Sequence, residues 1–498
     1  MGVKTSGTYE DQSGALLART WGMLVNGEIV QAKGGETFDT ASPADGRFLA
    51  GLPAAQKVDV DEAVEAAKAA FPGWRETPVT ERGAVLNRAI GVLRENAEDL
   101  AIMDAVDSGN PVTAMIGDVH LACRDLEYMK GAAMEVKGQT IPSQTGDWLL
   151  TRREPYGVVG RITAFNHSLM FPAAKLGAPL MTGNTLILKV PKQVSLAPLL
   201  MGELLKDVFP PGVVNIVTGD GRTAGEALVR HPDVKRLALI GGTDTGQRIQ
   251  ISAAEAAVKH VSLELGGKNP FIVFPDADLE KAAEAAVRGM NFQKTQGQSC
   301  GSTTRLFLHE SIHDEMLERV VELTSKIRVG SPLDSETEMG CIVSERQYNS
   351  ITAYIEAGKE DGAKLVHGGG KPEGAEFEKG FFLEPTIFDG VTMDMRIARE
   401  EIFGPVLSVL TWNDKEEVIR EANALEYGLT GAVWTRDLQT AIEVADQLDT
   451  GYVWINGSAT HFLGAPFSGH KNSGTDSEES IEELYSYTQS KTVNIGLG

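Results

Sequence analysis

A single cysteine stands in a polar stretch of the chain that reads FQKTQGQSCGSTTR over 292–305. Cysteines that serve only packing usually lie in apolar runs, where they behave as small hydrophobic residues. Cys300 is surrounded instead by glutamine, glycine and hydroxyl-bearing residues, which are typical of a loop that approaches a ligand. A thiol with a pKa of about 8.5 is mostly protonated at neutral pH, so a nucleophilic cysteine needs a nearby base or an electropositive setting. Cys300 is therefore a candidate nucleophile if the fold supplies such a partner.

Two polar residues lie at or just after the ends of apolar runs that resemble strands. Both are candidates to assist Cys300. Glu264 lies near the end of the run in VSLELGGKNP, where Gly266 and Gly267 permit a tight turn. Its carboxylate is a candidate base, and the alternative is an exposed glutamate beside a turn. Asn166 follows RITAF, and its amide is a candidate oxyanion donor, with a helix cap as the alternative.

The elements that would position these residues form two α/β regions. Apolar runs without polar alternation are typical of strands buried on both faces, and helical stretches between them indicate parallel crossovers. The first region predicts an open doubly wound sheet with a ligand beyond the carboxyl ends of its strands, and its runs are GVVGRITAF, NTLILKV, GVVNIVTG, RLALIGG and HVSLEL. The second region carries Cys300, and its runs are PFIVF, TTRLFLH, PVLSVLTW, GAVWT and GYVWING.

Several segments lie outside these two alternating regions. Two amphipathic helices are expected before the first, one capped by Asp59 with Glu62 completing a capping box, and one starting at Thr80. Residues 1–20 lack an apolar signal core and are expected to be a flexible lead-in. The stretch 138–155 and the chain end are expected to be exposed strands, whose edges invite pairing with another subunit.

Composition limits the classes of function that are open to this chain. A length of 498 residues predicts two or three domains, because single cores stop growing below that size. The net charge of −23 argues against nucleic-acid and anionic-membrane partners, and no apolar run is long enough for a membrane span. Cys123, Cys300 and Cys341 are too few and too scattered for a disulfide framework or a metal site, which fits a reducing cytoplasm.

Several stretches together resemble one family. LELGGKNP, QGQSC, EEIFGPV, GNTLILK, PFSGHKNSG and the asparagine after RITAF occur in the order and spacing of the NAD(P)-dependent aldehyde dehydrogenase superfamily. The resemblance implies the aldehyde dehydrogenase fold, with a Rossmann-like cofactor domain, an α/β catalytic domain and a small β oligomerisation domain. We expect the cofactor domain at 21–137 and 157–267, the catalytic domain at 268–473, and the oligomerisation domain at 138–156 and 474–498.

The resemblance also implies catalytic roles. Cys300 resembles the family nucleophile, which forms a thiohemiacetal with the aldehyde and then, after hydride loss, a thioester. Asn166 and the backbone N–H of Cys300 would hold the developing oxyanion, and Glu264 would activate the water that releases the carboxylic acid. Lys175 and Glu478 align with a proton relay, and the alternatives are a structural helix lysine and a solvated acidic tail.

Cofactor contacts are implied at strand ends of the first region and in one motif of the second. Glu401 and Phe403 of EEIFGPV resemble a clamp on the nicotinamide ribose, and Lys189 resembles the lysine that contacts the adenosine ribose. GGTDTG resembles a pyrophosphate turn before a helix, where N-terminal amides favour anions, although the family usually has serine at Gly242. The further expected contacts are Ile162, Thr163, Phe165, Gly221, Gly225, Gly241, Gly246 and Leu265.

Lys192 departs from the pattern of many NAD-preferring members, which carry a glutamate three residues after the lysine of GNTLILK. That glutamate accepts a hydrogen bond from the adenosine 2′-hydroxyl and repels a 2′-phosphate. A lysine reverses the sign, and Arg222 is a candidate neighbour. We therefore expect NAD or NADP as cofactor, with a lean towards NADP acceptance. The alternative is a solvated lysine that points away from the cofactor.

The aldehyde pocket is expected to contain His167, Phe171, His461 and Phe467, each of which has packing as its alternative role. None of them is a base suited to a distal carboxylate, so an apolar or aromatic aldehyde is expected. The other functions considered are a CoA-acylating semialdehyde dehydrogenase, which usually lacks the glutamate at position 264, a non-catalytic scaffold of the same fold, and a cysteine hydrolase. The expected assembly is a homodimer or homotetramer.

Overall fold

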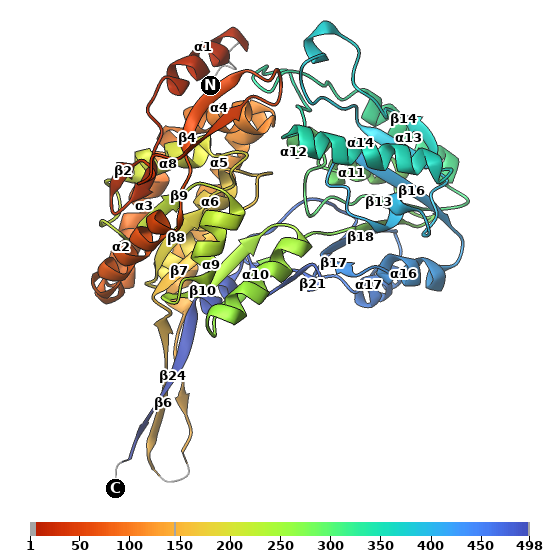
Figure 1. The fold of residues 1–498 in the computed structure, drawn as a ribbon. Coiled ribbons are helices and arrows are strands. Elements are labelled where there is room, and N and C mark those ends of the chain that lie inside the picture. Colours follow the sequence, from red (N-terminus) through yellow and green to blue (C-terminus); the bar gives the residue numbers. More distant parts are fainter. Residues whose placement is uncertain (1–5, 144–145, 497–498) are drawn as a thin grey trace.

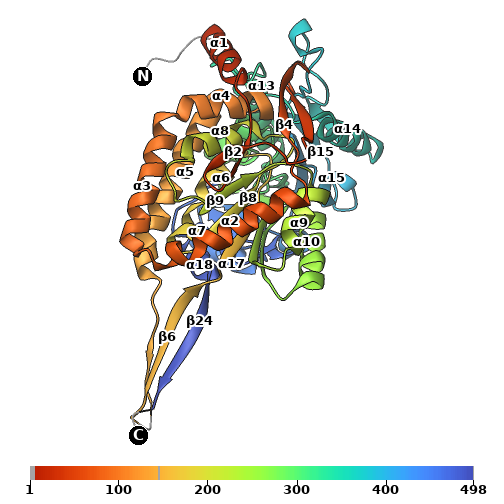
Figure 2. The same ribbon diagram turned by 60° about the vertical axis from the view of Figure 1, so that its left-hand side comes forward.

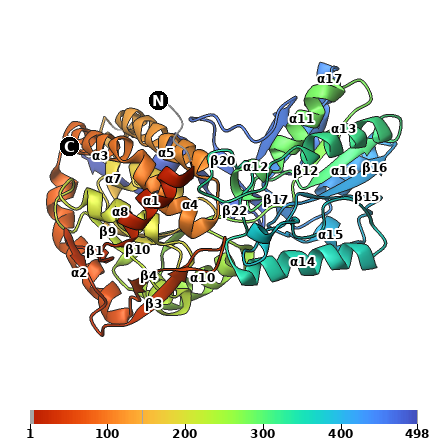
Figure 3. The same ribbon diagram turned by 90° about the horizontal axis from the view of Figure 1, so that it is seen from above.

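Two α/β lobes and a projecting arm make up the protein (Figure 1). The computed structural model describes residues 6–143 and 146–496. The first lobe holds the segments drawn from red to green, and the second lobe holds most of the green-to-blue C-terminal half. Seen from above, the lobes lie side by side, and short C-terminal strands lie at their boundary (Figure 3). The arm consists of β6 (Trp148–Pro155) and β24 (Thr488–Ile495) with the short β5 (Thr140–Ile141).

The sheet of the first lobe has the strand order β2-β1-β9-β8-β7-β10-β11-β22, and its central run from β9 to β11 is parallel. The central strands coincide with the apolar runs of the first region, so the predicted doubly wound sheet is confirmed. The outer strands β1, β2 and β22 add antiparallel pairs at the two edges. The bounds are β1 Met23–Val25, β2 Glu28–Val30, β7 Val158–Ile162, β8 Thr185–Lys189, β9 Val214–Val217, β10 Val234–Ile240, β11 His260–Glu264 and β22 Gly474–Thr475.

Helices cover both faces of this sheet, which explains why its strands lack polar alternation. Leu186 and Leu188 of β8 join one core, while Ile187 between them joins the core that contains α2. Figure 2 shows α2 lying across β8 and β9. The helices are α2 Lys57–Glu76, α3 Val79–Glu95, α4 Ala97–Ser108, α5 Val112–Ala132, α6 Met170–Ala174, α7 Gly177–Met181, α8 Leu196–Leu205, α9 Glu226–Arg230 and α10 Thr243–Ala256, with shorter turns at Ala133–Glu135 and Gly221–Gly225.

The first two predicted helices exist, but α2 begins two residues before the predicted cap. Asp59 is a residue of the first turn, and its Oδ2 accepts a hydrogen bond from the backbone N–H of Gln56 at 2.7 Å. Glu62 completes no capping box and pairs with the side chain of Lys33 instead. A carboxylate can accept hydrogen bonds from the unpaired N–H groups at a helix start either as the N-cap or as a residue of the first turn. The sequence alone therefore did not fix the first residue of α2. The next helix begins at Val79, one residue before its predicted start.

The second lobe repeats this construction around a sheet of order β14-β15-β16-β13-β12-β18-β19, which is parallel except for β14. Its strands are β12 Pro270–Val273, β13 Arg305–His309, β14 Lys364–His367, β15 Thr386–Asp389, β16 Val406–Trp412, β18 Thr430–Trp434 and β19 Tyr452–Ile455. Its helices are α11 Leu279–Gly289, α12 Phe292–Thr295, α13 His313–Ser325, α14 Glu345–Glu360, α15 Arg396–Arg399, α16 Lys415–Asn423 and α17 Leu438–Gln447, with a turn at Ala375–Phe377.

The arm is the antiparallel pair of β6 and β24, which runs in register from Pro155 opposite Thr488 to Trp148 opposite Ile495. Trp148 and Ile495 are exposed near its far end, and Ile141 on β5 is exposed as well. Large apolar side chains on an open strand edge are typical of a surface that pairs with another chain. The predicted exposed strands are therefore present, and their pairing with a second subunit stays a prediction.

Residues 474–487 belong to the body of the protein rather than to the arm, which differs from the expected boundary at 474. β22 pairs with β11, and β23 (Ser477–Glu478) pairs with β20 (Phe467–Ser468). Helix α18 (Ile481–Ser486) follows, and Leu484 and Tyr487 are fully buried. Burial of these two side chains fixes the segment against the first lobe before the chain enters β24.

The N-terminal segment is helical, and the expected flexible lead-in over 1–20 is wrong for its described part. Helix α1 spans Ser6–Leu17, and residues 1–5 lie outside the described residues. Tyr9 and Leu16 are buried in the core of the first lobe, which holds the helix in place. The remaining strands are β3 Thr37–Ala41, β4 Phe48–Pro53, β17 Tyr427–Gly428 and β21 His470–Lys471. Among the described helices, none has the length and apolar character that a membrane crossing requires.

Candidate active site

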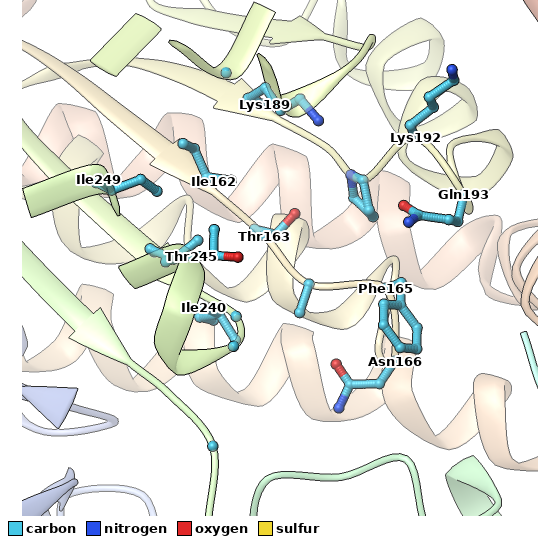
Figure 4. Close-up of a pocket in the computed structure, with 18 of the residues that line it drawn as sticks. Ile162, Thr163, Phe165, Asn166, Lys189, Lys192, Gln193, Ile240, Thr245 and Ile249 are labelled. Carbon is cyan, nitrogen blue, oxygen red and sulfur yellow. The ribbon is translucent and has the colours of Figure 1, made fainter. Parts of the chain in front are cut away.

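A cleft of about 690 Å³ opens where the carboxyl ends of the first lobe's parallel strands face the second lobe. Parallel strands place the residues that follow them at one edge of the sheet, as the sequence pattern required. Figure 4 shows Ile162 at the end of β7, followed by Thr163, Phe165 and Asn166, with Lys189 and Lys192 on the neighbouring segment. The predicted residues that line the cleft are Ile162, Thr163, Phe165, Asn166, Lys189, Lys192, Gly221, Gly225, Gly241, Gly242, Glu264, Cys300, Glu401 and Phe403.

Asn269 fixes the loop that carries the thiol. Its Nδ2 donates to the backbone oxygens of Cys300 at 2.7 Å and of Ser302 at 2.9 Å, while its Oδ1 accepts from the N–H of Thr430 at 3.1 Å. One buried amide therefore connects the start of β12, the cysteine loop and β18. Gly297 in the same loop has a φ of +71°, and a Cβ there would collide with a backbone oxygen of the second lobe. The loop is thus held by backbone contacts rather than by the cysteine side chain.

The Cys300 thiol and the Glu264 carboxyl are neighbours whose charged forms disfavour each other. Burial, then the adjacent Glu264, raises the pKa of the Cys300 thiol well above its ordinary value. Burial raises the pKa of Glu264 to about 8, and a hydrogen bond with the thiol offsets part of that rise. Oε1 of Glu264 has no hydrogen-bond partner among the described residues. Near neutral pH both groups hold their protons, and Glu264 becomes a base as the pH passes about 8.

Asn166 presents an uncommitted amide to the same cleft. Its backbone oxygen accepts a hydrogen bond from Nδ2 of Asn110 at 3.0 Å, which holds the segment from below. Its side-chain Oδ1 is buried without a hydrogen-bond partner among the described residues. Phe165 packs edge-on against Phe403 across the cleft, with ring centroids 5.6 Å apart. The residue is therefore anchored through its backbone, and its Nδ2, which is the atom that would donate to an oxyanion, makes no hydrogen bond to another described residue.

Glu401 joins the two lobes at the end of β11. Its Oε1 accepts the backbone N–H of Gly267 at 3.0 Å, and a Cβ at Gly266 would collide with its carboxylate. Burial raises the pKa of Glu401 to about 7, although that N–H and Lys268 oppose the rise. Phe403 follows with a positive φ of 53°, and Gln347 Nε2 donates to its backbone oxygen at 2.8 Å. The missing side chain at Gly266 therefore leaves room for the Glu401 carboxylate to reach the N–H of Gly267.

The rest of the cleft fits a ligand that carries hydroxyls and phosphates. Lys189 is buried and donates no hydrogen bond to any described residue, and burial lowers the pKa of its amine to about 8. Oγ1 of Thr163 is likewise buried without a partner in the described part of the chain. Gly241 and Gly242 precede α10, whose first turn faces the cleft through Thr245. The cations along the cleft are Lys189, Lys192, Arg222, Arg248 and Arg346.

Two predicted cofactor residues lie behind the cleft wall. Gly246 and Leu265 are both buried, and a Cβ at Gly246 would lie 2.8 Å from Leu265 Cδ2. The glycine thus lets α10 approach β11 closely, which supports the turn without lining it.

Lys175 and Glu478 lie together in a buried ion-pair network away from the cleft wall. Lys175 Nζ is 3.2 Å from Glu478 and 3.0 Å from Glu483, and Arg161 also contacts Glu478. Burial pushes the pKa of Glu478 upwards, but the charges of Arg161 and Lys175 outweigh it and hold the pKa at about 2. Glu478 is therefore no solvated tail residue, and its side chain is only 15% exposed.

The residues expected at the aldehyde pocket form two clusters, neither of which lines the described cleft. His167 Nδ1 is 2.6 Å from Asp118 Oδ2, and the imidazole packs edge-on against Phe171 at 5.3 Å. His461 stacks on Phe467 with ring centroids 4.5 Å apart. Contact with an aldehyde stays a prediction for both clusters.

Sequence reasoning missed the contributions of α14 and of several residues beside the predicted ones. Gln193 adjoins Lys192, and Asp220 adjoins Gly221, so a wider reading of those turns would have found them. Arg346 and Gln347 lie about fifty residues from the nearest predicted motif, and only the helix cap at Ser344 marks their position. Arg222, the expected neighbour of Lys192, lines the cleft as well. The missed lining residues are Ala164, Pro191, Gln193, Asp220, Glu226, Val229, Leu239, Ile240, Thr245, Arg248, Ile249, Gly266, Val343, Ser344, Arg346 and Gln347.

The family model of the aldehyde dehydrogenases, described as "Aldehyde dehydrogenase family", matches residues 29–493. This chain belongs to the aldehyde dehydrogenase family. An aldehyde dehydrogenase of Talaromyces stipitatus, tropH, is 46% identical over 467 residues, which cover 92% of this chain and 90% of the relative. The predicted family and its mixed α/β fold are confirmed, and the protein is an oxidoreductase acting on aldehydes.

Two solved structures of the family resemble the whole molecule. The NAD⁺ complex of an aldehyde dehydrogenase from Bacillus cereus has a TM-score of 0.94 at 40% identity, covering 97% of this chain and 98% of that one. An indole-3-acetaldehyde dehydrogenase of P. syringae, solved as a mutant with NAD⁺ and IAA, has a TM-score of 0.96 at 38% identity, covering 99% and 100%. A dinucleotide of the NAD(P) type is thus the cofactor that the cleft of this aldehyde dehydrogenase fits.

Proposed function

We propose that this aldehyde dehydrogenase oxidises an aldehyde to the free carboxylic acid through a thiohemiacetal and a thioester on Cys300. The observation that carries the proposal is that the Cys300 thiol and the buried Glu264 carboxyl line one cleft, together with Asn166 and Glu401, and that Glu264 contributes to the raised pKa of the thiol. Lys189, Glu401 and the turn before α10 would hold the cofactor. Bound NAD(P)⁺ supplies the acceptor for the hydride that leaves the captured carbon.

The proton steps are assigned to residues of this chain. Glu264 takes the proton of the Cys300 thiol as sulfur attacks the aldehyde carbon. The Asn166 amide and the backbone N–H of Cys300 donate hydrogen bonds to the oxygen that becomes negative. Glu264 must release this first proton to solvent before it can act again. After oxidation it takes a proton from water, the hydroxide attacks the thioester, and the departing sulfur takes that proton back from Glu264 as the acid leaves. The relay role that the family resemblance implies for Lys175 and Glu478 stays a prediction, because the charges of Arg161 and Lys175 hold the pKa of Glu478 at about 2 and keep it ionised.

The alternatives are less well supported. A CoA-acylating member has no use for a base that activates water, and Glu264 stands in the cleft with one oxygen unpaired among the described residues. A non-catalytic scaffold or a cysteine hydrolase does not agree with relatives that are named aldehyde dehydrogenases. Release of a free acid is therefore the proposed outcome.

We propose further that NADP is accepted as well as NAD. Lys192 lies on the cleft, exposed, with its Nζ 5.3 Å from the centre of the Phe38 ring. Arg222 lines the same cleft, which places two cations at the end that holds Lys189. Asp220 opposes them, so the preference is expected to be modest.

Initial rates with NAD⁺ and NADP⁺ test the cofactor proposal. Lys192→Glu is expected to raise KM for NADP⁺ about tenfold or more, because it places a like charge beside the 2′-phosphate, and to change KM for NAD⁺ much less. Lys364→Glu, at the exposed first residue of β14 in the other lobe, serves as the control of equal charge change. A hundredfold preference of the unmodified enzyme for NAD⁺ would contradict the proposal.

The proposed substrate is an apolar or aromatic aldehyde. The rings of Tyr452, His461 and Phe467 form one cluster, and the P. syringae relative is named for an indole aldehyde. The same rate measurements over aliphatic, aromatic and carboxylated aldehydes give the ranking. The highest kcat/KM with a carboxylated aldehyde would overturn this choice.

We propose that the arm pairs with a second copy, giving a homodimer or homotetramer. The exposed Trp148 and Ile495 support this, because they leave apolar surface on an open strand. Light scattering is expected to report two or four times the chain mass of 53.4 kDa, and Trp148→Glu is expected to lower it. A particle of 53.4 kDa for the unmodified chain would rule the pairing out.

A reducing cytoplasm is the proposed location, supported by three unpaired cysteines.

A further inference from the structure

A buried carboxylate connects the two segments that carry the proposed oxyanion donor and the proposed nucleophile. Asp118 lies on α5, and its side chain is 1% exposed. Its Oδ2 is 2.6 Å from Nδ1 of His167, and its Oδ1 is 2.8 Å from Nζ of Lys294. Burial alone would raise the pKa of Asp118, but the charges of His167 and Lys294 outweigh it and lower the pKa. The carboxylate therefore stays ionised between two partners.

The two partners belong to different lobes. His167 directly follows Asn166 in the loop beyond β7, and Lys294 lies on α12, six residues before Cys300. Figure 1 and Figure 3 both show α12 at the edge of the second lobe, facing the helices of the first. Asp118 thus ties the Asn166 segment to the Cys300 loop across the lobe boundary.

Other polar groups hold each segment separately. Asn110 and Asp104 bind the backbone of the first segment, at Asn166 and Leu169, with distances of 3.0 and 3.1 Å. Asn269 holds the backbone of Cys300 from within the second lobe. Asn269 thus fixes its segment within the second lobe, whereas Asp118 acts on the distance between the two segments.

We propose that Asp118 is a positioning residue that sets the separation of Asn166 from Cys300 through its contacts with His167 and Lys294. The inference rests on the proposed function, in which those two residues act on the same carbon–oxygen bond. An oxyanion donor works only when it lies at hydrogen-bond distance from the oxygen, and a displacement of about 1 Å costs on the order of a hundredfold in rate. A buried ion pair adds little to stability but prescribes a geometry, which suits a part shared by two lobes.

The cluster also explains why a basic side chain near the cysteine loop need not select acidic aldehydes. The charge of Lys294 is already matched by Asp118 at 2.8 Å. A distal carboxylate on the substrate would have to compete with a fully buried partner. We therefore expect the pair of Asp118 and Lys294 to hold the geometry of the site and not to recognise a charged substrate.

The test compares Asp118→Asn and Lys294→Gln with Asp107→Asn. Asp107 is the matched control, because it is equally buried on α4 and accepts hydrogen bonds from Thr40 and Leu196, away from the cleft. With a two- or three-carbon aldehyde, kcat/KM is expected to fall about a hundredfold for Asp118→Asn and about tenfold for Lys294→Gln. Cofactor affinity, measured by NADH fluorescence, is expected to stay unchanged, and the control is expected to lose thermal stability but keep its kcat/KM.

Two readouts separate positioning from packing and from substrate contact. His167→Gln and Lys294→Gln are expected to combine with less than multiplicative loss, since both act through Asp118. Lys294→Gln decides the question if Asp118→Asn fails to fold, because the Lys294 side chain is 35% exposed and Asp118 keeps its contact with His167. Unchanged kcat/KM in Lys294→Gln, or a loss confined to bulky aldehydes, would overturn the proposal. Full activity of Cys300→Ala would instead overturn the proposed function itself.

Discussion

Cys300→Ala is expected to lower kcat/KM for aldehyde oxidation by about 10⁴-fold or more, because the described lining of the cleft offers no second thiol for the covalent intermediate. Cys300→Ser is expected to lose nearly as much, since a hydroxyl beside Glu264 is a far weaker nucleophile than a thiolate. Both variants are expected to bind NADH with unchanged affinity, because Asn269 holds the loop through the backbone oxygen of Cys300. Stopped-flow NAD(P)H formation and fluorescence titration measure the two effects.

Cys123→Ala is the matched control for that experiment. Cys123 is a buried thiol of the first lobe, and burial raises its pKa to about 11, so it is not expected to react. The control is expected to lose stability by about 1 kcal/mol through a lost packing contact and to keep its turnover. Undiminished aldehyde oxidation by Cys300→Ser would remove the nucleophile from the proposed function.

The strands and the cleft could be predicted because one physical pattern fixes both. In a run such as NTLILKV the three central residues are apolar without alternation, since Ile187 faces one helical layer and Leu186 and Leu188 face the other. Such runs must be parallel and covered, and their carboxyl ends must share an edge. Asn166 and Glu264, which follow or end these strands, were therefore brought to the same cleft.

Contacts made across the lobe boundary could not be predicted. Gln347 and Asp118 lie on helices whose sequences indicate only amphipathic packing, and nothing local marks which polar side chain turns towards the site. The same limit applies to α1. Tyr9 and Leu16 are buried in the core of the first lobe, but the sequence of the segment gives no indication of this burial. Whether such a side chain is buried, and against what, depends on the surface that packs against it and not on the local sequence.

The chain is acidic overall, but the charges that line the cleft suit an anionic cofactor. The net charge is −23, yet the cleft wall carries lysines and arginines, and its two innermost carboxyls, Glu264 and Glu401, have raised pKa values. Burial keeps those carboxyls partly protonated near neutral pH, which reduces their repulsion of phosphate. The same desolvation prepares Glu264 as a base whose pKa lies close to the working range.

Glu264→Gln is expected to lower steady-state turnover about 10³-fold, because glutamine cannot take the proton of the hydrolytic water. NAD(P)H formation in the first turnover is expected to fall less than acid release, so a burst of about one equivalent per site should precede the slow phase. Rapid mixing with excess cofactor resolves the two phases. Glu400→Gln is the control, since Glu400 pairs with Arg396 and Tyr354 outside the cleft. Full steady-state turnover in Glu264→Gln would exclude Glu264 as the base.

The pH dependence gives this assignment a second test. The pKa of Glu264 is raised to about 8, so the group is protonated and inactive as a base below that pH and becomes active as the pH rises through it. Turnover should therefore increase about tenfold per pH unit below 8 and level off above it. Glu264→Gln should lose that limb while Glu400→Gln keeps it. The raised pKa of Glu264 comes mainly from burial. A rise in turnover centred at about pH 5 would mean that water reaches the carboxyl, and it would exclude Glu264 as a buried base.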